Sequence, residues 1–583
     1  MLAASSTPAL YTYLINTQPH SKLTQETLAT PYPLTGLSGP NIHPVTLARL
    51  MLIFAITLQS PCGEKVPGLS ESSSVLKGRL VTAATTWVTT KEEMHGTVEC
   101  LVCIILEGVF KTNSGNLRQA WGVYRRAMTV AQIMGLHRTP MPPLKRVDQD
   151  FVANPAFLWF RIVYMDRYLS LLLGLPQGTP DKSMGVPSIL QHEPPLGKFE
   201  RQLTVIASRI LERNESAFDA CETTTTQFID SELLGVSKSM PASFWRPANF
   251  LGLTLGSPNS LLETVRLAAQ VYYYGLLIQV HLPYMMHGID DHTEQRYSQI
   301  TCVNASREIM TRFIAHRSFN PMSSCSRPVD FFALLAAMTL LLAHLDAHHH
   351  QEATSFLAHQ RLSDRAMLDQ ALERMDVISN LNGDATTEHS ARLIRRLLEI
   401  EADAAEGSSY TATSIREDEH GWRGGIETSS EEVRLHIPYL GVIKITRQGP
   451  ISREPSVENP ATRQHQDPQV ETPQRHQSYP AFDNAFAPLP NQSHTHEQQT
   501  PSQLNIMTQS SPFSDAHLQP SGYHEQSMVQ YSNSCLDGLT LQANAELPSI
   551  AAGIDDWALQ GVDMAFFDTL LRGAPGADNA ALE

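Results

Sequence analysis

Cys100 and Cys103 form a C-x-x-C pair, and a pair of this kind can supply half of a tetrahedral zinc site. They stand in an apolar run, VECLVCIILEGVF, that favours a helix, and no second pair lies within the usual distance. Free cysteine is among the most buried residue types. We therefore interpret both thiols as core residues rather than as metal ligands.

Histidines at the end of a long apolar stretch form a second group. His344 and His348 are four residues apart, so a helix would place them on one face, where they could bind a metal. The sequence H-L-D-A-H lacks the glutamate that follows the first histidine in a metalloprotease helix. We favour an interaction of these histidines with the dipole at the helix C-terminus.

An acidic run at 290–294, Asp-Asp-His-Thr-Glu, resembles the magnesium motif of terpene synthases, which are also all-α. The second metal motif of those enzymes does not appear downstream, and charge clusters are usually solvated loops. There is also no phosphate-binding loop, dinucleotide-binding glycine pattern or hydrolase nucleophile elbow. We expect no enzyme, and keep an all-α, metal-dependent enzyme that uses this run as the alternative.

Asp166 and Arg167 stand inside an aromatic helical segment. Apolar neighbours within one turn predict that Asp166 is at least partly buried. A buried carboxylate must be paired, so we expect Asp166 to bond an arginine or a helix terminus rather than to act in catalysis.

The elements that carry these residues read as helices. The clearest covers 116–136, where apolar residues recur every three or four positions and Gly135 is placed to cap the end. The next opens at Asn154-Pro155 and stops at Gly174. A central apolar helix follows Asp330, whose side chain can cap its first turn. Further helices are predicted over 261–286 (broken near Pro283), 361–378 and 389–400. Strand-like alternation is almost confined to 433–445, so we predict an all-α body.

The charge distribution separates the body from the end of the chain. The 583 residues carry a net charge of −16, yet residues 1–400 hold 34 basic and 34 acidic side chains. No dense Lys/Arg stretch suits the chain to bind nucleic acid by itself. Seven cysteines without repeated spacing indicate a reducing compartment. The sequence has no recognisable signal peptide, and its most apolar run, 331–345, is too short to span a bilayer, so we expect neither a secreted nor a membrane protein.

The C-terminal part changes in character twice. From 448 to about 530 it is rich in Gln, Ser, Pro, His and Asn, which predicts disorder. Residues 550–572 then interleave aspartates with aromatic and aliphatic residues, a pattern typical of a segment that folds as a helix in a partner's groove. The side chains expected to enter a coactivator are Trp557, Met564, Phe566, Phe567, Leu570 and Leu571.

Together these segments resemble the middle homology region of fungal-specific transcription factors, a family usually headed by a binuclear zinc cluster. The resemblance covers about residues 40–400 and implies an all-α regulatory domain without known chemistry, with a C-terminal segment similar to the activation segments of other members. The resembling pieces are AWGVYRRAMTVAQIMGLHR (120–138), LWFRIVYMDRYLSLLLGLPQGTPD (158–181), YYYGLLIQVHLPYM (272–285), YSQITCVNASREIMTRF (297–313) and SRPVDFFALLAAMTLLLAHLDAH (326–348).

The sequence departs from this family at the DNA-binding head. The head needs six cysteines in two C-x-x-C halves that share two zinc ions. No arrangement of Cys62, Cys100, Cys103, Cys221, Cys302, Cys325 and Cys535 supplies that pattern. We expect either a head-less coregulator that reaches DNA through a bound partner, or a truncated chain whose zinc head lies upstream. Zinc is therefore expected only with such an upstream cluster.

We expect a nuclear transcriptional regulator, an activator of one pathway or gene cluster in secondary metabolism. The expected domains are an N-terminal extension (1–40), the middle homology domain (41–405), a low-complexity linker (406–548) and an acidic-aromatic activation segment (549–574). Its partners would be a coactivator and either a DNA-binding protein or a second copy of the chain. A compatible alternative is a ligand-sensing module that binds a metabolite between its helices.

Overall fold

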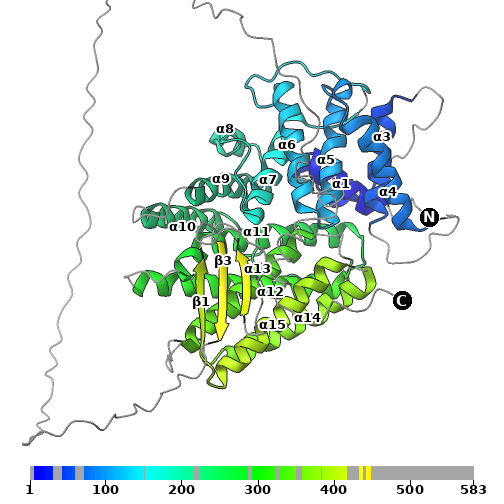
Figure 1. Ribbon diagram of the computed structural model, residues 1–583. Coiled ribbons are helices and arrows are strands. Elements are labelled where there is room, and N and C mark those ends of the chain that lie inside the picture. Colours follow the sequence, from blue (N-terminus) through cyan, green and yellow to red (C-terminus); the bar gives the residue numbers. More distant parts are fainter. Residues whose placement is uncertain are drawn as a thin grey trace, which may run out of the picture. The chain divides into compact units, whose positions relative to one another are not determined.

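The computed structural model describes residues 6–447, except 31–41, 60–70, 150, 216–221, 287–291, 323–326, 350–356, 383, 416–431 and 438–440. Within the described residues the chain forms fifteen α-helices, a few short 3₁₀ and π turns, and one three-stranded sheet (Figure 1). The all-α prediction for the body is confirmed. The predicted linker after 447 and the activation segment lie outside the described residues.

The helices follow one another along the chain, and their connections range from a few residues, as between α5 and α6, to the long segments before α7 and α11. Their bounds are α1 (Ser6–Thr17), α2 (Gln25–Ala29), α3 (Pro44–Thr57), α4 (Ser73–Ala84), α5 (Val98–Asn113), α6 (Leu117–Ile133), α7 (Pro155–Leu173), α8 (Pro187–Leu190), α9 (Pro195–Glu215), α10 (Glu222–Lys238), α11 (Pro258–Met286), α12 (His292–Phe319), α13 (Arg327–His349), α14 (Arg361–Asn382) and α15 (Ala385–Ala405).

Local signals in the sequence set several helix ends as predicted. The side chain of Asn154 accepts a hydrogen bond from the amide of Phe157 at 3.0 Å, and Pro155 occupies the first turn of α7. Gly174 ends the same helix with a φ of 66°, a left-handed conformation that glycine adopts without strain. Gly135, just after α6, has a φ of 82° for the same reason.

Two helix boundaries differ from the prediction. Helix α11 continues through Pro283 to Met286, because Leu282 and Tyr284 on either side of the proline are buried in the core and their packing compensates for the lost hydrogen bond. Helix α13 begins at Arg327, so Asp330 lies in its first turn. The carboxylate of Asp330 accepts hydrogen bonds from Arg317 at 2.8 and 2.7 Å instead of capping the helix.

Helix α13 lies at the centre of the second half of the body. It packs against α11, α12 and α15, and its apolar side chains belong to the continuous hydrophobic core. By length and hydropathy alone, 327–348 could cross a membrane, yet 83% of its most apolar window is buried inside the protein. The prediction of a central helix buried on all sides therefore fits its surroundings.

The first predicted domain boundary does not separate α1 from the helical body. Helix α1 packs against α3 and α7, and its residues Leu10 and Leu14 are buried. The hydroxyl of Tyr13 donates to the carbonyl of Val152 at 2.8 Å, across 139 residues of sequence. The described body thus begins within the segment that the sequence assigned to an extension.

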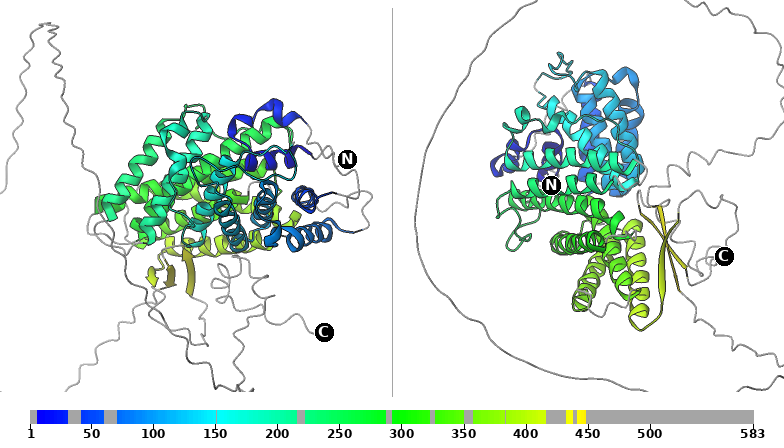
Figure 2. Two further views of the ribbon diagram at one scale, coloured as in Figure 1. Left: turned by 90° about the horizontal axis from the view of Figure 1, so that it is seen from above. Right: turned by 90° about the vertical axis from the view of Figure 1, so that its left-hand side faces the viewer.

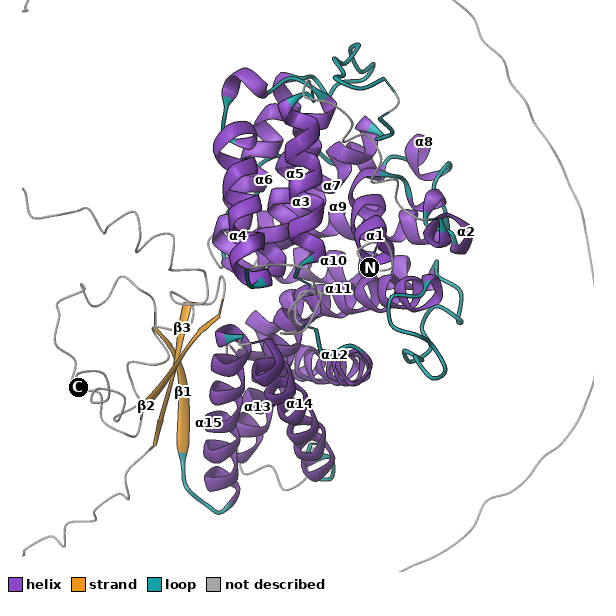
Figure 3. Cartoon of the chain, turned by 90° about the vertical axis from the view of Figure 1, so that its right-hand side faces the viewer, coloured by secondary structure: helices purple, strands orange, loops and turns teal. Residues whose placement is uncertain are grey.

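A small antiparallel sheet follows the last helix. It consists of β1 (Tyr410–Ile415), β2 (Glu432–Ile437) and β3 (Gly441–Arg447) in the order β1-β3-β2, with Val433 opposite Ile445. Alternate residues of β2 and β3 are buried in the core, as the strand-like stretch at 433–445 predicts. Figures 2 and 3 show the sheet beside α15. In the sequence, its strands fall within the first part of the predicted linker, 406–548.

Candidate ligand-binding cavity

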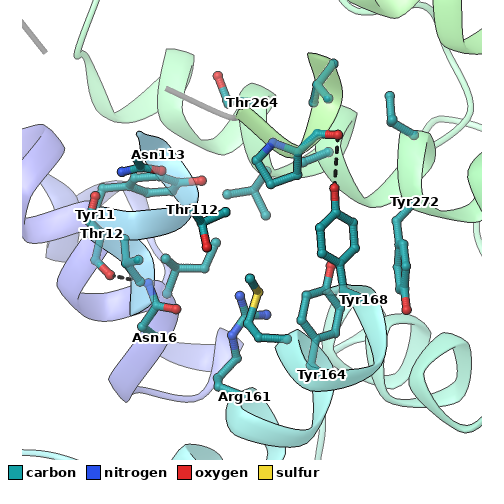
Figure 4. Close-up of a pocket in the computed structure, with 18 of the residues that line it drawn as sticks. Tyr11, Thr12, Asn16, Thr112, Asn113, Arg161, Tyr164, Tyr168, Thr264 and Tyr272 are labelled. Atoms are coloured by element: carbon teal, nitrogen blue, oxygen red, sulfur yellow. Dashed lines mark hydrogen bonds between the residues drawn. The ribbon is translucent and has the colours of Figure 1, made fainter. Parts of the chain in front are cut away.

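A cavity of about 190 Å³ lies inside the helical body, among α1, α5, α7, α11 and α13 (Figure 4). Residues from well-separated parts of the chain line it, from Tyr11 on α1 to Phe332 on α13. Its lining is mostly aromatic and aliphatic, with a small number of polar groups. This composition is typical of small-molecule binding sites in proteins.

One face of α7 supplies the floor of the cavity. Arg161, Tyr164 and Tyr168 are spaced by three and four residues, which places them on the same side of the helix. The guanidinium of Arg161 lies 4.4 Å from the ring centre of Tyr164. The hydroxyl of Tyr168 donates to the carbonyl of Pro328 at 3.1 Å, so this tyrosine is fixed in place (Figure 4).

Aromatic rings from three helices form a continuous wall. The ring centre of Tyr272 lies 5.2 Å from Tyr164 and 5.7 Å from Tyr168, and Phe332 contacts Tyr168 edge to face at 5.6 Å. Gly275 makes this wall possible, because a Cβ atom at that position would overlap the ring of Phe332. The wall therefore depends on the close approach of α11 and α13.

Three of the four threonines that line the cavity satisfy their hydroxyl groups within their own helices. Thr57, Thr112 and Thr264 each donate to the carbonyl four residues earlier, at 2.8 to 2.9 Å. Their hydroxyl protons are therefore not offered to the cavity.

Three other donors on residues that line the cavity have no hydrogen-bond partner. They are the hydroxyl groups of Tyr124 and Tyr272 and the Nε of Arg161, and all three residues are buried. Figure 4 shows Tyr272 beyond Tyr164 and Tyr168, with its hydroxyl pointing away from the cavity. Burial raises the pKa of both tyrosines well above the ordinary value, so each phenol stays protonated and able to donate. Buried donors are rarely left unused in folded proteins.

The charges at the cavity largely cancel. Glu200 lies 3.3 Å from Nη1 of Arg161 and 2.9 Å from Nε2 of His20. Burial by itself would raise the pKa of Glu200, but its neighbours His20, Arg161 and Arg201 lower it below the ordinary value, so the carboxylate is ionised. The positive charge of Arg161 is thus already paired.

None of the described cavity residues pairs a serine or cysteine nucleophile with a base. Nor does any group of three or more His, Cys, Asp or Glu residues suit a metal ion within the described part of the chain.

The structure accounts for several candidates from the sequence without assigning them chemistry. Cys100 and Cys103 are fully buried in α5, as predicted. Asp166 is buried on α7, where its carboxylate lies 2.8 Å from Nε of Arg125 and accepts from the amide of Gly178 at 2.7 Å. The prediction that it bonds an arginine is confirmed.

The histidines near the end of α13 have carboxylate partners. Nε2 of His344 lies 2.9 Å from Asp364, and Nε2 of His348 lies 2.9 Å from Glu401. These contacts, made with α14 and α15, are partners that the sequence did not predict, and the dipole interaction that we favoured stays a prediction.

Other candidates lie outside the described residues. Asp290 and Asp291 of the acidic run fall in an undescribed gap, and the side chains at 292–294 are not described. The same holds for the expected coactivator contacts, Trp557, Met564, Phe566, Phe567, Leu570 and Leu571.

Sequence reasoning did not identify the cavity residues. Arg161 and the tyrosines of α7 were placed in a core helix, and nothing marked Tyr124 or Tyr272 as unpartnered. A usable signal was present, since the spacing of Arg161, Tyr164 and Tyr168 puts three polar groups on one face of a largely apolar helix.

Sequence comparison places the chain among fungal proteins with regulatory names. It is 36% identical to a dehydrocurvularin biosynthesis regulator of Alternaria cinerariae, over 98% of this chain and 78% of that protein. A regulator of the same name from Aspergillus terreus is also 36% identical, over 98% and 79%. The probable transcription factor gsfR1 of Penicillium aethiopicum is 35% identical, over 95% and 76%. No family model and no solved structure matches the chain.

Proposed function

The chain belongs to the fungal family of transcription factors and biosynthesis regulators represented by these relatives, and we propose that it regulates transcription of the genes for one secondary-metabolite pathway. The observation that carries this proposal is the extent of the similarity. At 35–36% identity it runs through 95–98% of the chain rather than through a single helix or motif.

The helical body is proposed to be the regulatory part of the protein. Its helices share one continuous hydrophobic core. Residues 41–405 would correspond to the middle homology region, and α1 extends the same core toward the N-terminal side.

The C-terminal residues are proposed to carry the activating function. Residues 406–548 would act mainly as a linker, and 549–574 as an acidic-aromatic activation segment that docks into a coactivator. The support is the sequence pattern, in which four aspartates alternate with large apolar side chains between 555 and 571.

Contact with DNA is proposed to come from outside these 583 residues. The seven cysteines do not form a binuclear zinc pattern, and the first 400 residues are electrically neutral. Either a zinc-cluster head joined upstream or a DNA-bound partner, including a second copy of the chain with its own head, would supply the contact. The site of action would be the nucleus.

Deletion of the gene, followed by transcript sequencing, tests this function. Loss of the chain is expected to lower transcripts of one contiguous set of biosynthetic genes, and reintroduction of the 583-residue coding sequence or its upstream-extended form should restore them. Unchanged transcripts under conditions in which the metabolite is made would refute the proposal. Mapping the 5′ end of the messenger RNA separates the two sources of DNA contact, because an upstream cysteine cluster is either encoded in frame or not.

A further inference from the structure

We propose that the cavity binds a neutral, largely apolar small molecule that carries hydrogen-bond acceptors such as carbonyl or ether oxygens, and that this molecule is an effector of the protein. The effector role rests on the proposed function. The binding itself depends only on the cavity.

The size and lining of the cavity favour a ligand with an apolar ring system. An engineered cavity of about 150 Å³ lined by aliphatic and aromatic residues binds benzene. The present cavity, at about 190 Å³, has room for a somewhat larger molecule. Rings of Tyr164, Tyr272 and Phe332 offer faces and edges for stacking against it.

The unpartnered donors call for acceptors on that molecule. One phenol hydroxyl group, from Tyr124, and one guanidinium N–H, from Arg161, are buried among the lining residues without a partner. They come from two helices, α6 and α7. An unpaired buried donor costs free energy, and an acceptor on a bound molecule would recover it. A hydrocarbon of the same shape would leave both donors unsatisfied.

The paired charges call for a neutral molecule. Arg161 already lies 3.3 Å from the ionised Glu200, which also contacts His20. A carboxylate ligand would bring a second negative charge next to Glu200 in a buried setting, where charges of like sign repel strongly. A carbonyl or ether oxygen accepts from the same donors without that repulsion.

Three probes of similar size test the ligand class on the full-length chain. Coumarin is neutral and carries a lactone, naphthalene lacks acceptors, and 2-naphthoate is an anion. Calorimetry and thermal unfolding are expected to show that coumarin binds about tenfold more tightly than naphthalene, the ratio that one or two buried hydrogen bonds provide. 2-Naphthoate is expected to bind most weakly. Equal binding of coumarin and naphthalene, preference for the anion, or no coumarin binding would each overturn the proposal.

Substitutions of tyrosine by phenylalanine locate the binding. Tyr124→Phe removes a hydroxyl group that has no partner, so the variant should fold at least as stably as the parent while its coumarin affinity falls about five- to tenfold. Tyr168→Phe is the matched control, because its hydroxyl already bonds Pro328. It is expected to lower stability and to change affinity by less than twofold. Unchanged coumarin affinity in Tyr124→Phe would show that binding occurs elsewhere, and the proposal would fall.

The effector role is tested by measuring transcripts of the regulated genes in the fungus. The gene carrying Tyr124→Phe, returned to the deletion strain, is expected to shift the transcript level of the regulated genes although the protein accumulates normally. Transcripts equal to those of the parent would remove the effector role. Failure of coumarin binding, with transcripts still dependent on the chain, would refute this inference and leave the proposed function intact.

Discussion

Arg327 in the first turn of α13 and Asp384 at the N-cap of α15 form a bidentate ion pair, although the two residues are 57 positions apart in the sequence. Nη2 of Arg327 donates to Oδ1 of Asp384 at 2.8 Å, and Nη1 contacts the other carboxylate oxygen. Only 1% of the arginine side chain and 10% of the aspartate side chain is exposed. Asp384 also caps α15 by accepting from the amide of Thr387. The carboxylate of Asp384 thus caps α15 and also stabilises the contact between α15 and α13.

Replacing this carboxylate should destabilise the body strongly. Asp384→Asn removes the bidentate counter-charge of the buried Arg327, which keeps the more distant Asp330 at 3.8 Å, so the free energy of unfolding at pH 7 is expected to fall by about 3 kcal/mol. Asp376→Asn is a suitable control, because Asp376 pairs with Arg395 on the surface, with both side chains more than 40% exposed. That change should cost at most about 1 kcal/mol. Similar losses in the two variants, measured by urea unfolding, would contradict the prediction.

The same ion pair predicts a loss of stability in acid. Burial would raise the pKa of Asp384, but the hydrogen bonds and charge of Arg327 together with Thr387 lower it from 3.8 to about 2. Because the folded value lies below the unfolded one, the ionised carboxylate stabilises the fold fully above about pH 4, and this is lost as pH falls toward 2. The contribution is about 2 kcal/mol. Asp364 and Glu401, whose pKa values are also lowered, act in the same direction.

Thermal unfolding between pH 5 and pH 2 measures this effect. The melting temperature of the parent should drop across that interval, and the drop should be smaller in Asp384→Asn, which has no carboxylate to protonate. Asp330 opposes the trend, since burial raises its pKa. Identical pH profiles for parent and variant would show that the pair is not linked to folding.

A methyl group at Gly275 should disturb the cavity wall. Gly275→Ala forces its Cβ into the ring of Phe332, and overpacking of this kind costs about 1–3 kcal/mol. Gly122→Ala in α6 is the matched control, since nothing lies within 4 Å of the added carbon. The control should be more stable than the parent by about 0.5–1 kcal/mol. A destabilised control, or an unaffected Gly275→Ala, would contradict this account.

The cysteines of α5 should be inert in the folded protein. Burial raises the pKa of Cys100 to about 12 and that of Cys103 well above its ordinary value, and the thiol of Cys103 donates to the carbonyl of Val45 at 3.5 Å. Iodoacetamide at pH 8 is therefore expected to label neither residue until the chain is unfolded in guanidinium, as peptide mass spectrometry can show. Rapid labelling of the folded chain, or loss of bound zinc in Cys100→Ala, would restore a reactive or metal-binding role.

Activation is predicted to depend on the aromatic residues near the C-terminus. Alanine at Phe566, Phe567 and Leu570 removes the apolar contacts with a coactivator, so a tethered reporter should fall to background. A matched triple variant at Phe482, Phe486 and Leu489 changes the same residue types within the predicted linker and should leave the reporter active. Full activity of the first variant would show that the segment does not carry this role. Loss of activity in both variants would show that activation also depends on residues of the predicted linker.

The sequence predicted those parts of the fold that neighbouring residues determine. Asn154 caps α7 and Gly174 ends it, because both effects act within a few residues. The predicted capping of α13 by Asp330 was wrong. The helix begins earlier, at Arg327, and the carboxylate of Asp330 binds Arg317, which lies on another helix. Periodicity does not report such partners.

The cavity escaped prediction for the same reason. Spacing alone puts Arg161, Tyr164 and Tyr168 on one face, but only the folded chain brings that face against Pro328, 160 residues beyond Tyr168. Whether a tyrosine hydroxyl is paired or unpaired, as at Tyr168 and Tyr124, depends on these distant contacts.

Helix α1 gives the cavity a mechanical connection to the N-terminal side of the body. Tyr11 and Asn16 line the cavity from this helix, and the amide of Asn154 donates to the carbonyl of Thr17 at 3.0 Å, which joins α1 to the start of α7. Any domain or tag joined ahead of Ser6 is therefore attached to a cavity wall by a few residues. If filling the cavity shifted that wall, α1 would transmit the displacement to a domain fused ahead of Ser6.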